Sequence, residues 1–443
     1  MTHSGWRQGI VTITYEKLVI ALMLLLSLPN TFMLIASSIL LALYMLVWQR
    51  KRGGAVKALI FIAMRTPLST GFAATYENYA IVKWALLLGL SLYIVLTNPW
   101  PRQRLARRFL LLIAGLSLYI IFIGLFNSGY PVTSAFKVFS WAFVLSAVIV
   151  GVLACDRVDW TAHMCWYLNL ILLLSPLSWA LGIAYLRNGR GYQGLLNHPN
   201  MMGVIASICF TLNLYLMQER RESGRTVFLL LAAVQGVLSL SRTGVISMVL
   251  SFIAFTLFVM KRGWKKTLTI LLSFMGIAAL IIFGFGDSVI DFIYKGRSVG
   301  ELFYSREGQI ARYMEKFHAH PLFGSGFMVP QNSAGKSFVL SFELSIEPGN
   351  LIIALLGDLG IVGTILFFVP YIVLLRHMDK RKLSLFLLPF IVSMGEMIFF
   401  STNNTAILYY VLYAVCLLPG KKRRTAHQGL IRSARLGRYP TPR

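Results

Sequence analysis

Apolar runs follow one another along most of this chain, with only short polar or basic segments between them. A run of about 20 apolar residues crosses a bilayer as a helix, and soluble monomers rarely expose so much contiguous apolar surface. Only 13% of the 443 residues are charged, whereas a soluble domain carries about 25%. We therefore predict an all-α polytopic membrane protein.

Span length predicts roughly 12–14 transmembrane helices. The first apolar run leads directly into the second without a small-residue cleavage site, so we expect a retained helix and not a signal peptide. Arg65 and Pro67 interrupt the span at 55–70, for which a re-entrant segment is the alternative. The predicted spans are 13–28, 31–49, 55–70, 80–98, 108–126, 133–154, 164–185, 200–217, 225–240, 243–260, 267–286, 350–375, 384–400 and 404–419.

The chain has a formal net charge of +26, but its lysines and arginines gather in short loops between apolar runs. Cytoplasmic loops of membrane proteins collect positive charge in this way, so topology explains the charge better than nucleic-acid binding does. When the amino terminus is placed in the cytoplasm and the spans alternate, every basic cluster falls on the cytoplasmic side. The clusters are 50–52, 102–108, 220–221, 261–266, 376–382 and the tail from 421.

We expect a single transmembrane domain over residues 1–420, with a large structured extracytoplasmic loop at 287–349. Residues 421–443 form a basic tail that suits anionic lipid headgroups and is predicted to be disordered and cytoplasmic. The cysteines lack metal-ligand spacing and the histidines lack a carboxylate cluster, so we expect free thiols and no metal site. The cysteines are Cys155, Cys165, Cys209 and Cys416.

The large loop contains a predicted amphipathic helix that begins near Ser305, with apolar residues at helical spacing over 310–317. We expect this helix to lie over the outer surface of the membrane domain. Arg306 shares its apolar face, where an unpaired arginine is costly, so Arg306 should face a cavity. Arg312 and Lys316, four residues apart, form a second face, on which Arg312 is either a solvated residue or a ligand for an anion.

A polar turn at 190–203 separates two apolar runs. The guanidinium fork of Arg190 matches phosphate oxygens, although an arginine at a helix end also snorkels to the lipid headgroups. Asn200 belongs to the part of this turn that breaks and caps the next helix, and it is a further candidate ligand. Arg242 lies between two apolar runs with almost no loop, where it either reaches headgroups or marks a substrate path.

Three side chains on the predicted outer face are candidates for a general base. His198 and His318 titrate near neutral pH, but each is also an ordinary polar residue at a turn or a helix end. Glu347 either gains stability from the dipole of the following helix or accepts a proton from a hydroxyl group. Asn350 caps that helix, and Asp358 inside it is costly unless it is paired or faces a cavity.

Four segments, in their order and spacing, resemble the O-antigen ligase and polymerase superfamily of bacterial inner-membrane enzymes. They are 190–203, 239–244, 305–326 with its His-Pro-Leu-Phe-Gly-Ser-Gly ending, and 350–363. The resemblance implies a GT-C-like membrane glycosyltransferase that works on the periplasmic face. It implies an inverting transfer that needs neither a metal ion nor another cofactor.

The resemblance also implies the ligands. Arg190, Arg242 and Arg306 would hold the diphosphate of an undecaprenyl-diphosphate-linked oligosaccharide, where cations neutralise the departing group. The acceptor would be a second glycan in a polymerase or lipid A–core in a ligase. Membrane lipids and a chain-length regulator are further candidate partners.

One departure from the superfamily favours a polymerase. The ligases carry a histidine directly before the asparagine that begins the last of these segments, whereas this chain has Gly349 there and Glu347 two residues earlier. We therefore predict polymerisation of repeat units into O-antigen, capsule or exopolysaccharide, with O-antigen ligase as the alternative. A glycolipid flippase would also use broken helices and cavity arginines, but the sequence has no internal repeat of the kind common in transporters.

Overall fold

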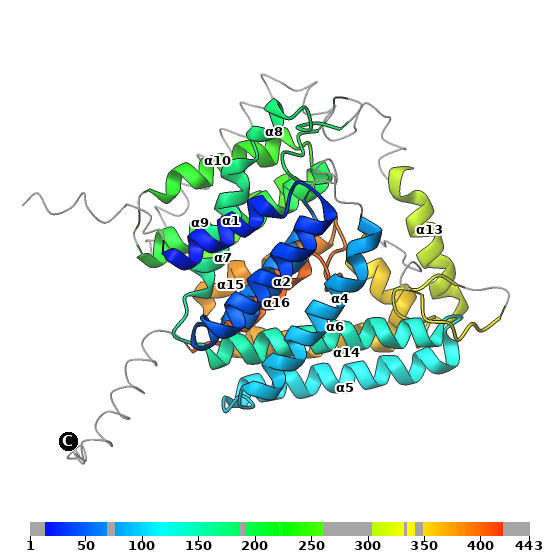
Figure 1. Ribbon diagram of the computed structural model, residues 1–443. Helices are drawn as coiled ribbons and strands as arrows, with labels where there is room; N and C mark the ends of the chain where they lie inside the picture. The colour runs from blue at the N-terminus through cyan, green and yellow to red at the C-terminus, as the bar shows by residue number, and fades with distance from the viewer. Residues whose placement is uncertain are drawn as a thin grey trace, which may run out of the picture.

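The computed structural model describes residues 14–68, 76–186, 189, 191–220, 222, 224–259, 304–331, 335–341 and 349–419. These residues form helices joined by turns, with two isolated β-bridges (Figure 1). The helices are α1 (Tyr15–Leu26), α2 (Thr31–Val47), η1 (Arg50–Arg52), α3 (Gly54–Arg65), α4 (Tyr76–Thr97), α5 (Arg104–Asn127), α6 (Pro131–Ala154), α7 (Trp160–Leu174), α8 (Leu177–Ala180), α9 (Pro199–Arg220), α10 (Arg225–Leu238), α11 (Arg242–Ala254), η2 (Phe255–Val259), α13 (Tyr304–Ala319), α14 (Leu351–His377), η4 (Lys380–Lys382), α15 (Leu383–Ser393) and α16 (Ala406–Leu417).

Within the described residues, five helices are long and apolar enough to cross a membrane. They are α5, α6, α9, α14 and the part of α4 at Tyr79–Thr97. Shorter apolar helices are α2, α10, α11 and α16. These helices confirm the predicted all-α polytopic membrane protein. The predicted span at 267–286, most of the loop at 287–349 and the tail from 421 lie outside the described residues.

The predicted span at 164–185 was too long. In the structure α7 ends at Leu174, and the four-residue helix α8 follows after a turn. Pro176 has no N–H to donate and its ring clashes with a continuing helix, which explains the break.

The predicted span at 384–400 was also too long, because α15 ends at Ser393 and turns occupy residues 394–405. Phe399 and Phe400 in these turns are buried in an aromatic cluster between helices. The ring centroid of Phe400 lies 5.3 Å from that of Trp141 on α6, and the Phe399 ring lies 5.5 Å from that of Phe367 on α14. Tertiary packing of large rings therefore outweighs the helical preference of the apolar run.

Helix α3 lies inside the bundle, packed by α2, α4, α6 and α16, and all of its residues are buried. Arg65 at its end donates from Nη2 to the Ser27 carbonyl at 3.0 Å and from Nε to the Ser27 hydroxyl at 3.2 Å. These bonds solvate the guanidinium within the protein, so a buried arginine can end this short helix.

The connecting segments gather at two ends of the bundle. At one end, which we name the site end, Asn197 N donates to Pro67 O at 2.8 Å and Thr66 Oγ1 to Asn403 O at 2.7 Å. At the other, which we name the basic end, Lys57 pairs with Glu16 at 2.6 Å. Alternation of the predicted spans puts the loops at 65–79, 186–199 and 401–403 on the side opposite the basic clusters, and these two hydrogen bonds join the three loops.

At the basic end Arg220, which closes α9, pairs with Asp159 before α7. Lys382 Nζ donates to Val415 O and Leu418 O, each at 2.7 Å, and so joins η4 to the end of α16. Asp159 and Lys382 line one pocket, so two of the basic clusters that the sequence placed in cytoplasmic loops belong to the same end of the molecule.

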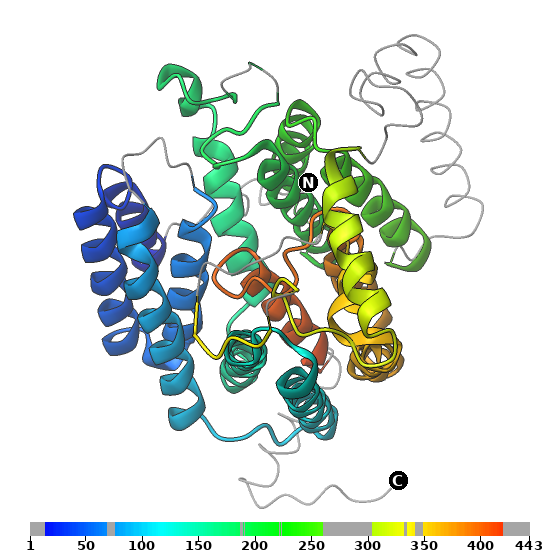
Figure 2. The same ribbon diagram turned by 90° about the vertical axis from the view of Figure 1, so that its right-hand side faces the viewer.

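Helix α13 packs on α14 at one edge of the molecule (Figure 2). Helix α14 is kinked at Gly360, whose φ of 66° and ψ of −172° are essentially restricted to glycine. The kink releases N–H groups of α14, and the turn after α13 accepts them: Ile361 N donates to Pro321 O at 2.9 Å and Val362 N to Leu322 O at 3.0 Å. A Cβ on Gly360 would lie 2.5 Å from the Leu322 backbone, so glycine permits this contact.

Candidate active site

The first turns of α9 and α11 touch backbone to backbone at the site end. A Cβ added to Gly203 would lie 2.5 Å from Ser241 Oγ, and one added to Gly244 would lie 2.6 Å from Gly203 Cα. Glycines at both positions let the two helices approach more closely than any larger side chain would allow. The N-termini of α9 and α11 therefore lie side by side.

The turn after α15 and the first turn of α14 join this pair of helix ends. A Cβ on Gly395 would lie 2.0 Å from Thr243 Oγ1 of α11. Asn350 caps α14 by accepting from Ile352 N at 2.9 Å, and its Nδ2 donates to Met394 O at 2.8 Å. Three helix N-termini, those of α9, α11 and α14, thus meet around residues 394–396.

Asn200 and Glu396 are in direct side-chain contact in this site, with Asn200 Nδ2 donating to Glu396 Oε1 at 2.7 Å. Both side chains are half-buried. Glu396 was not among the site residues predicted from the sequence, because the apolar run at 384–400 was predicted to be one helix. A single carboxylate in an apolar run was the available signal, since ionisable groups in membrane segments commonly mark function.

Arg242 is the first residue of α11, directly after the N-cap Ser241, whose hydroxyl accepts from Gly244 N at 3.2 Å. A cation at a helix N-terminus opposes the macrodipole, typically by about 0.3–1 kcal/mol, so helix stability does not account for this arginine. Leu240 just before it has a φ of 54°, a left-handed conformation that is strained for a bulky residue. Charge and strain at one turn both point to function.

His198 is exposed at the start of α9, where Asn200 N donates to His198 Nδ1 at 3.1 Å. A neutral imidazole that accepts at Nδ1 carries its proton on Nε2. In this geometry His198 shapes the helix start and its Nδ1 lone pair is already engaged. Glu396, whose carboxylate has several acceptor lone pairs, therefore joins His198 as a candidate proton acceptor of the site.

The remaining sequence candidates are distributed as follows. Arg312 and His318 are exposed on α13, and Arg312 Nε donates to Gly308 O of its own helix at 3.0 Å. No hydrogen bond or ion pair of the described residues connects either side chain to the three helix N-termini or to the turn at residues 394–396. Arg306 belongs to α13, but its side chain is outside the described part of the structure, and Arg190 and Glu347 lie outside the described residues altogether.

Lys316 corrects one prediction, because it is buried and does not share an outer face with the exposed Arg312. Its ammonium group pairs with Asp358 of α14 and donates to Gly326 O at 2.9 Å and to Val329 O at 2.8 Å. This ion pair offsets the free-energy cost of burying the Asp358 carboxylate inside α14, which was expected from the sequence. Since one ammonium group neutralises the carboxylate and satisfies two carbonyls, both charges can be buried.

The turn after α13 is fixed by further bonds to the same carboxylate and to α6. Met328 N donates to Asp358 Oδ2 at 2.8 Å, and Lys137 Nζ donates to Met328 O at 2.7 Å. Phe327 N donates to Ser134 Oγ at 2.8 Å. This buried network, which we name the Lys316–Asp358 clamp, attaches the turn to the helix that carries Asn350 at its start.

The described part of the chain contains no group of three or more His, Cys, Asp or Glu side chains arranged to hold a metal ion. All four cysteines are free thiols, and Cys165, Cys209 and Cys416 are buried. Arg242 and Glu396 contribute charged side chains to the described site, beside the N-termini of α9, α11 and α14.

These features define a polytopic membrane protein with a polar site built on converging helix ends. Residues 227–368, which are 142 of the 443, match the model of the family described as O-antigen ligase. Over these residues the match supports the resemblance to the O-antigen ligase and polymerase superfamily that the sequence motifs predicted. It includes Arg242, α13 and Asn350, whereas Asn200 and Glu396 lie outside it.

A search of curated proteins gave no match. The family implies a glycosyltransferase-like ligase or polymerase activity with lipid-linked glycans as substrates. It also implies that membrane lipids surround the protein. The apolar helices of this chain make it a multi-pass membrane protein.

Proposed function

We propose that this protein is a metal-independent, inverting glycosyltransferase of the bacterial inner membrane. It joins undecaprenyl-diphosphate-linked repeat units into O-antigen, capsule or exopolysaccharide on the periplasmic side, with both chain termini in the cytoplasm. The observation that carries this proposal is the convergence of three helix N-termini with Arg242, Asn200 and Glu396.

The diphosphate binds where positive potential gathers. Each helix N-terminus carries roughly half a positive charge, and backbone N–H groups there point toward an anion. Arg242 adds a guanidinium that holds two phosphate oxygens at once. Arg190 and Arg306 remain candidate ligands of the same diphosphate, as the superfamily resemblance implies. Arg312 and His318 are weaker candidates because they lie exposed on α13.

The transfer needs a proton acceptor near the attacking hydroxyl group. The hydroxyl oxygen attacks the anomeric carbon, the bond from that carbon to the diphosphate oxygen breaks, and the electron pair leaves with undecaprenyl diphosphate. Glu396 takes the hydroxyl proton, and Asn200 holds its carboxylate in place at 2.7 Å. Glu347 is the second candidate for this role, and His198 orients the start of α9.

Gly349 supports polymerisation over ligation. Its φ of 67° lies in the left-handed region, which a histidine at this position would occupy only with strain. The histidine that the ligases carry before the asparagine thus fits poorly into this backbone. O-antigen ligase, with lipid A–core as acceptor, stays the second candidate because the matching family carries that description.

Reconstitution separates the two reactions. The purified protein in liposomes receives undecaprenyl-diphosphate-linked single repeat units, with a chelator present and no other acceptor. Polymerisation predicts a ladder of lengthening lipid-linked chains. Product that forms only after lipid A–core is added would establish the ligase instead, and activity that requires a restored divalent ion would refute metal independence.

A further inference from the structure

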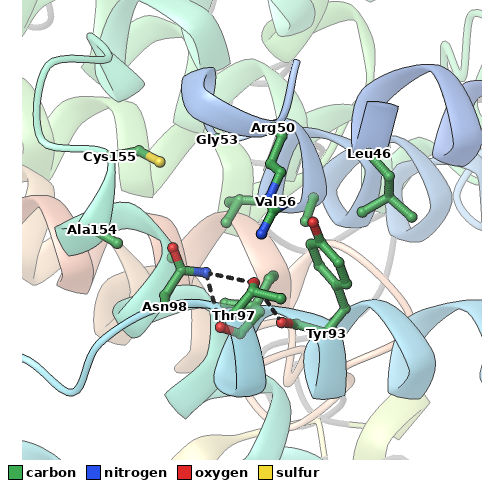
Figure 3. Close-up of a pocket in the computed structure, with 12 residues that line it drawn as sticks. Leu46, Arg50, Gly53, Val56, Tyr93, Thr97, Asn98, Ala154 and Cys155 are labelled. Carbon is green, nitrogen blue, oxygen red and sulfur yellow. Dashed lines mark hydrogen bonds between the residues drawn. The ribbon is translucent and has the colours of Figure 1, made fainter. Parts of the chain in front are cut away.

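A pocket of about 310 Å³, drawn in Figure 3, lies at the basic end of the molecule, away from the candidate active site at the site end. The turn between α2 and α3, the end of α4 and the end of α6 form its walls. The proposed reaction gives this pocket no role. What it binds must follow from its own lining.

The polar groups of the pocket come from η1 and the last turn of α4. Figure 3 shows the Arg50 side chain reaching into the pocket toward Tyr93 and Asn98. Asn98 Nδ2 is engaged internally, because it donates to Ile94 O at 2.8 Å and to Thr97 Oγ1 at 3.3 Å. Of the described residues that line the pocket, Arg50 carries the charge and none is a carboxylate. The lining therefore suits an anion, with the amide oxygen of Asn98 as an acceptor beside it.

The surroundings of the pocket indicate that the anion arrives on a lipid. Trp48 and Trp100, in the same turns, are 71% and 52% exposed, and aromatic rings of this kind concentrate at membrane–water interfaces. Leu43 of α2 and Leu96 of α4 are 52% and 74% exposed, so two of the helices that line the pocket also present apolar surface. Acyl chains can follow this surface while the headgroup stays at Arg50. A soluble anion would make no use of it.

We propose that this pocket binds the headgroup of an anionic phospholipid of the surrounding leaflet, with the phosphate on Arg50. Phosphatidylglycerol fits the lining, since its phosphate meets the guanidinium and its glycerol hydroxyl groups can donate to the Asn98 amide oxygen. The clustering of basic residues at this end raises the local concentration of anionic lipids. The bound lipid packs between α2 and α4 and holds the α2–α3 turn against α6.

The test compares Arg50→Gln with Arg52→Gln, an exposed arginine two residues away that does not line the pocket. The full-length protein in delipidated detergent is titrated with phosphatidylglycerol, phosphatidylethanolamine or inorganic phosphate. Lipid retention is read by native mass spectrometry and the melting temperature by fluorescence. Phosphatidylglycerol should bind the unchanged protein and Arg52→Gln alike, and bind Arg50→Gln about tenfold more weakly, the loss expected for one charge-assisted hydrogen bond.

A second variant, Ala154→Trp, fills the pocket from an exposed position on its wall and should also release the lipid while the protein stays folded. Equal retention of phosphatidylglycerol by Arg50→Gln and Arg52→Gln would overturn the site. So would equal stabilisation by phosphatidylethanolamine. Saturable binding of inorganic phosphate that Arg50→Gln abolishes, without preference for the lipid, would show a soluble-anion site and refute the lipid assignment.

Discussion

Lys316→Met should destabilise the protein by about 3–5 kcal/mol, the usual cost of breaking a buried ion pair from one side. The Lys316 ammonium group is fully buried, and it neutralises Asp358 while satisfying the carbonyls of Gly326 and Val329. Methionine fills similar space but leaves a buried carboxylate without this cation and two carbonyls without this donor. The turn after α13 would then lose its anchor on α14.

The double variant Lys316→Met/Asp358→Leu isolates the pairing from the other contacts. Removing both charges abolishes the uncompensated carboxylate, although Met328 N loses its acceptor at 2.8 Å. We expect the double variant to cost about 2 kcal/mol less than the sum of the two single changes, within the usual range for residues in contact. Arg312→Met is the matched control, since it removes an exposed cation from the same helix and should cost less than about 0.5 kcal/mol.

Equilibrium unfolding in mixed micelles measures these differences, and tryptophan fluorescence reports the loss of packing. Trp141 is a suitable reporter because its ring lies 6.1 Å from that of Phe327 in the anchored turn. If the double variant lost as much free energy of unfolding as the two single variants together, Lys316 and Asp358 would not be coupled. The clamp would then be refuted as a source of stability.

Three further outcomes follow from the structure. Gly360→Ala should lower the free energy of unfolding by at least about 1–3 kcal/mol, because the backbone angles of Gly360 are essentially restricted to glycine and a new Cβ would lie 2.5 Å from the Leu322 backbone. An unchanged melting temperature would refute the close contact. Burial raises the pKa of Asp159, but hydrogen bonds and the Arg220 guanidinium outweigh it and hold this pKa below its ordinary value. The ionised carboxylate therefore stabilises the folded protein fully above about pH 3.9, and this stabilisation is lost as the pH falls through the folded pKa. Acid unfolding that is the same in Asp159→Asn and in the unchanged protein would contradict this. Arg242→Lys should weaken binding of a lipid-linked diphosphate about tenfold by losing the bidentate contact, as fluorescence titration would reveal, and wild-type affinity would remove Arg242 from the diphosphate site.

The sequence predicted what depends on local patterns. Apolar runs and basic loops gave the membrane class and the division of loops between two ends, and Asn350 caps its helix as its residue type suggests. Pro321 lies in the turn that follows α13, where its missing N–H and its ring prevent the helix from continuing. These features need no knowledge of distant partners, since capping, breaking and hydrophobic patterning act within a few residues.

Long-range pairing decided what the sequence could not predict. Helical spacing gives Lys316 and Arg312 similar positions, yet Lys316 is buried because Asp358 lies opposite it on α14. Glu396 lies in a turn at the site, and not in a helix, because Phe399 and Phe400 pack into the aromatic cluster and α15 ends at Ser393. Neither outcome is encoded in a window of neighbouring residues, because both depend on which helices pack together.

Glu396→Gln tests the central claim that the converging helix ends form the active site. Glutamine keeps an oxygen that can accept from Asn200 Nδ2, so the local packing should survive while the basic group is lost. Glu315→Gln is the control, because it removes an exposed acid from α13. The measurement is single-turnover glycan transfer in liposomes together with donor affinity. Our account predicts transfer at least about 100-fold slower in Glu396→Gln, with donor affinity and Glu315→Gln unchanged. Transfer at the wild-type rate in Glu396→Gln would contradict it.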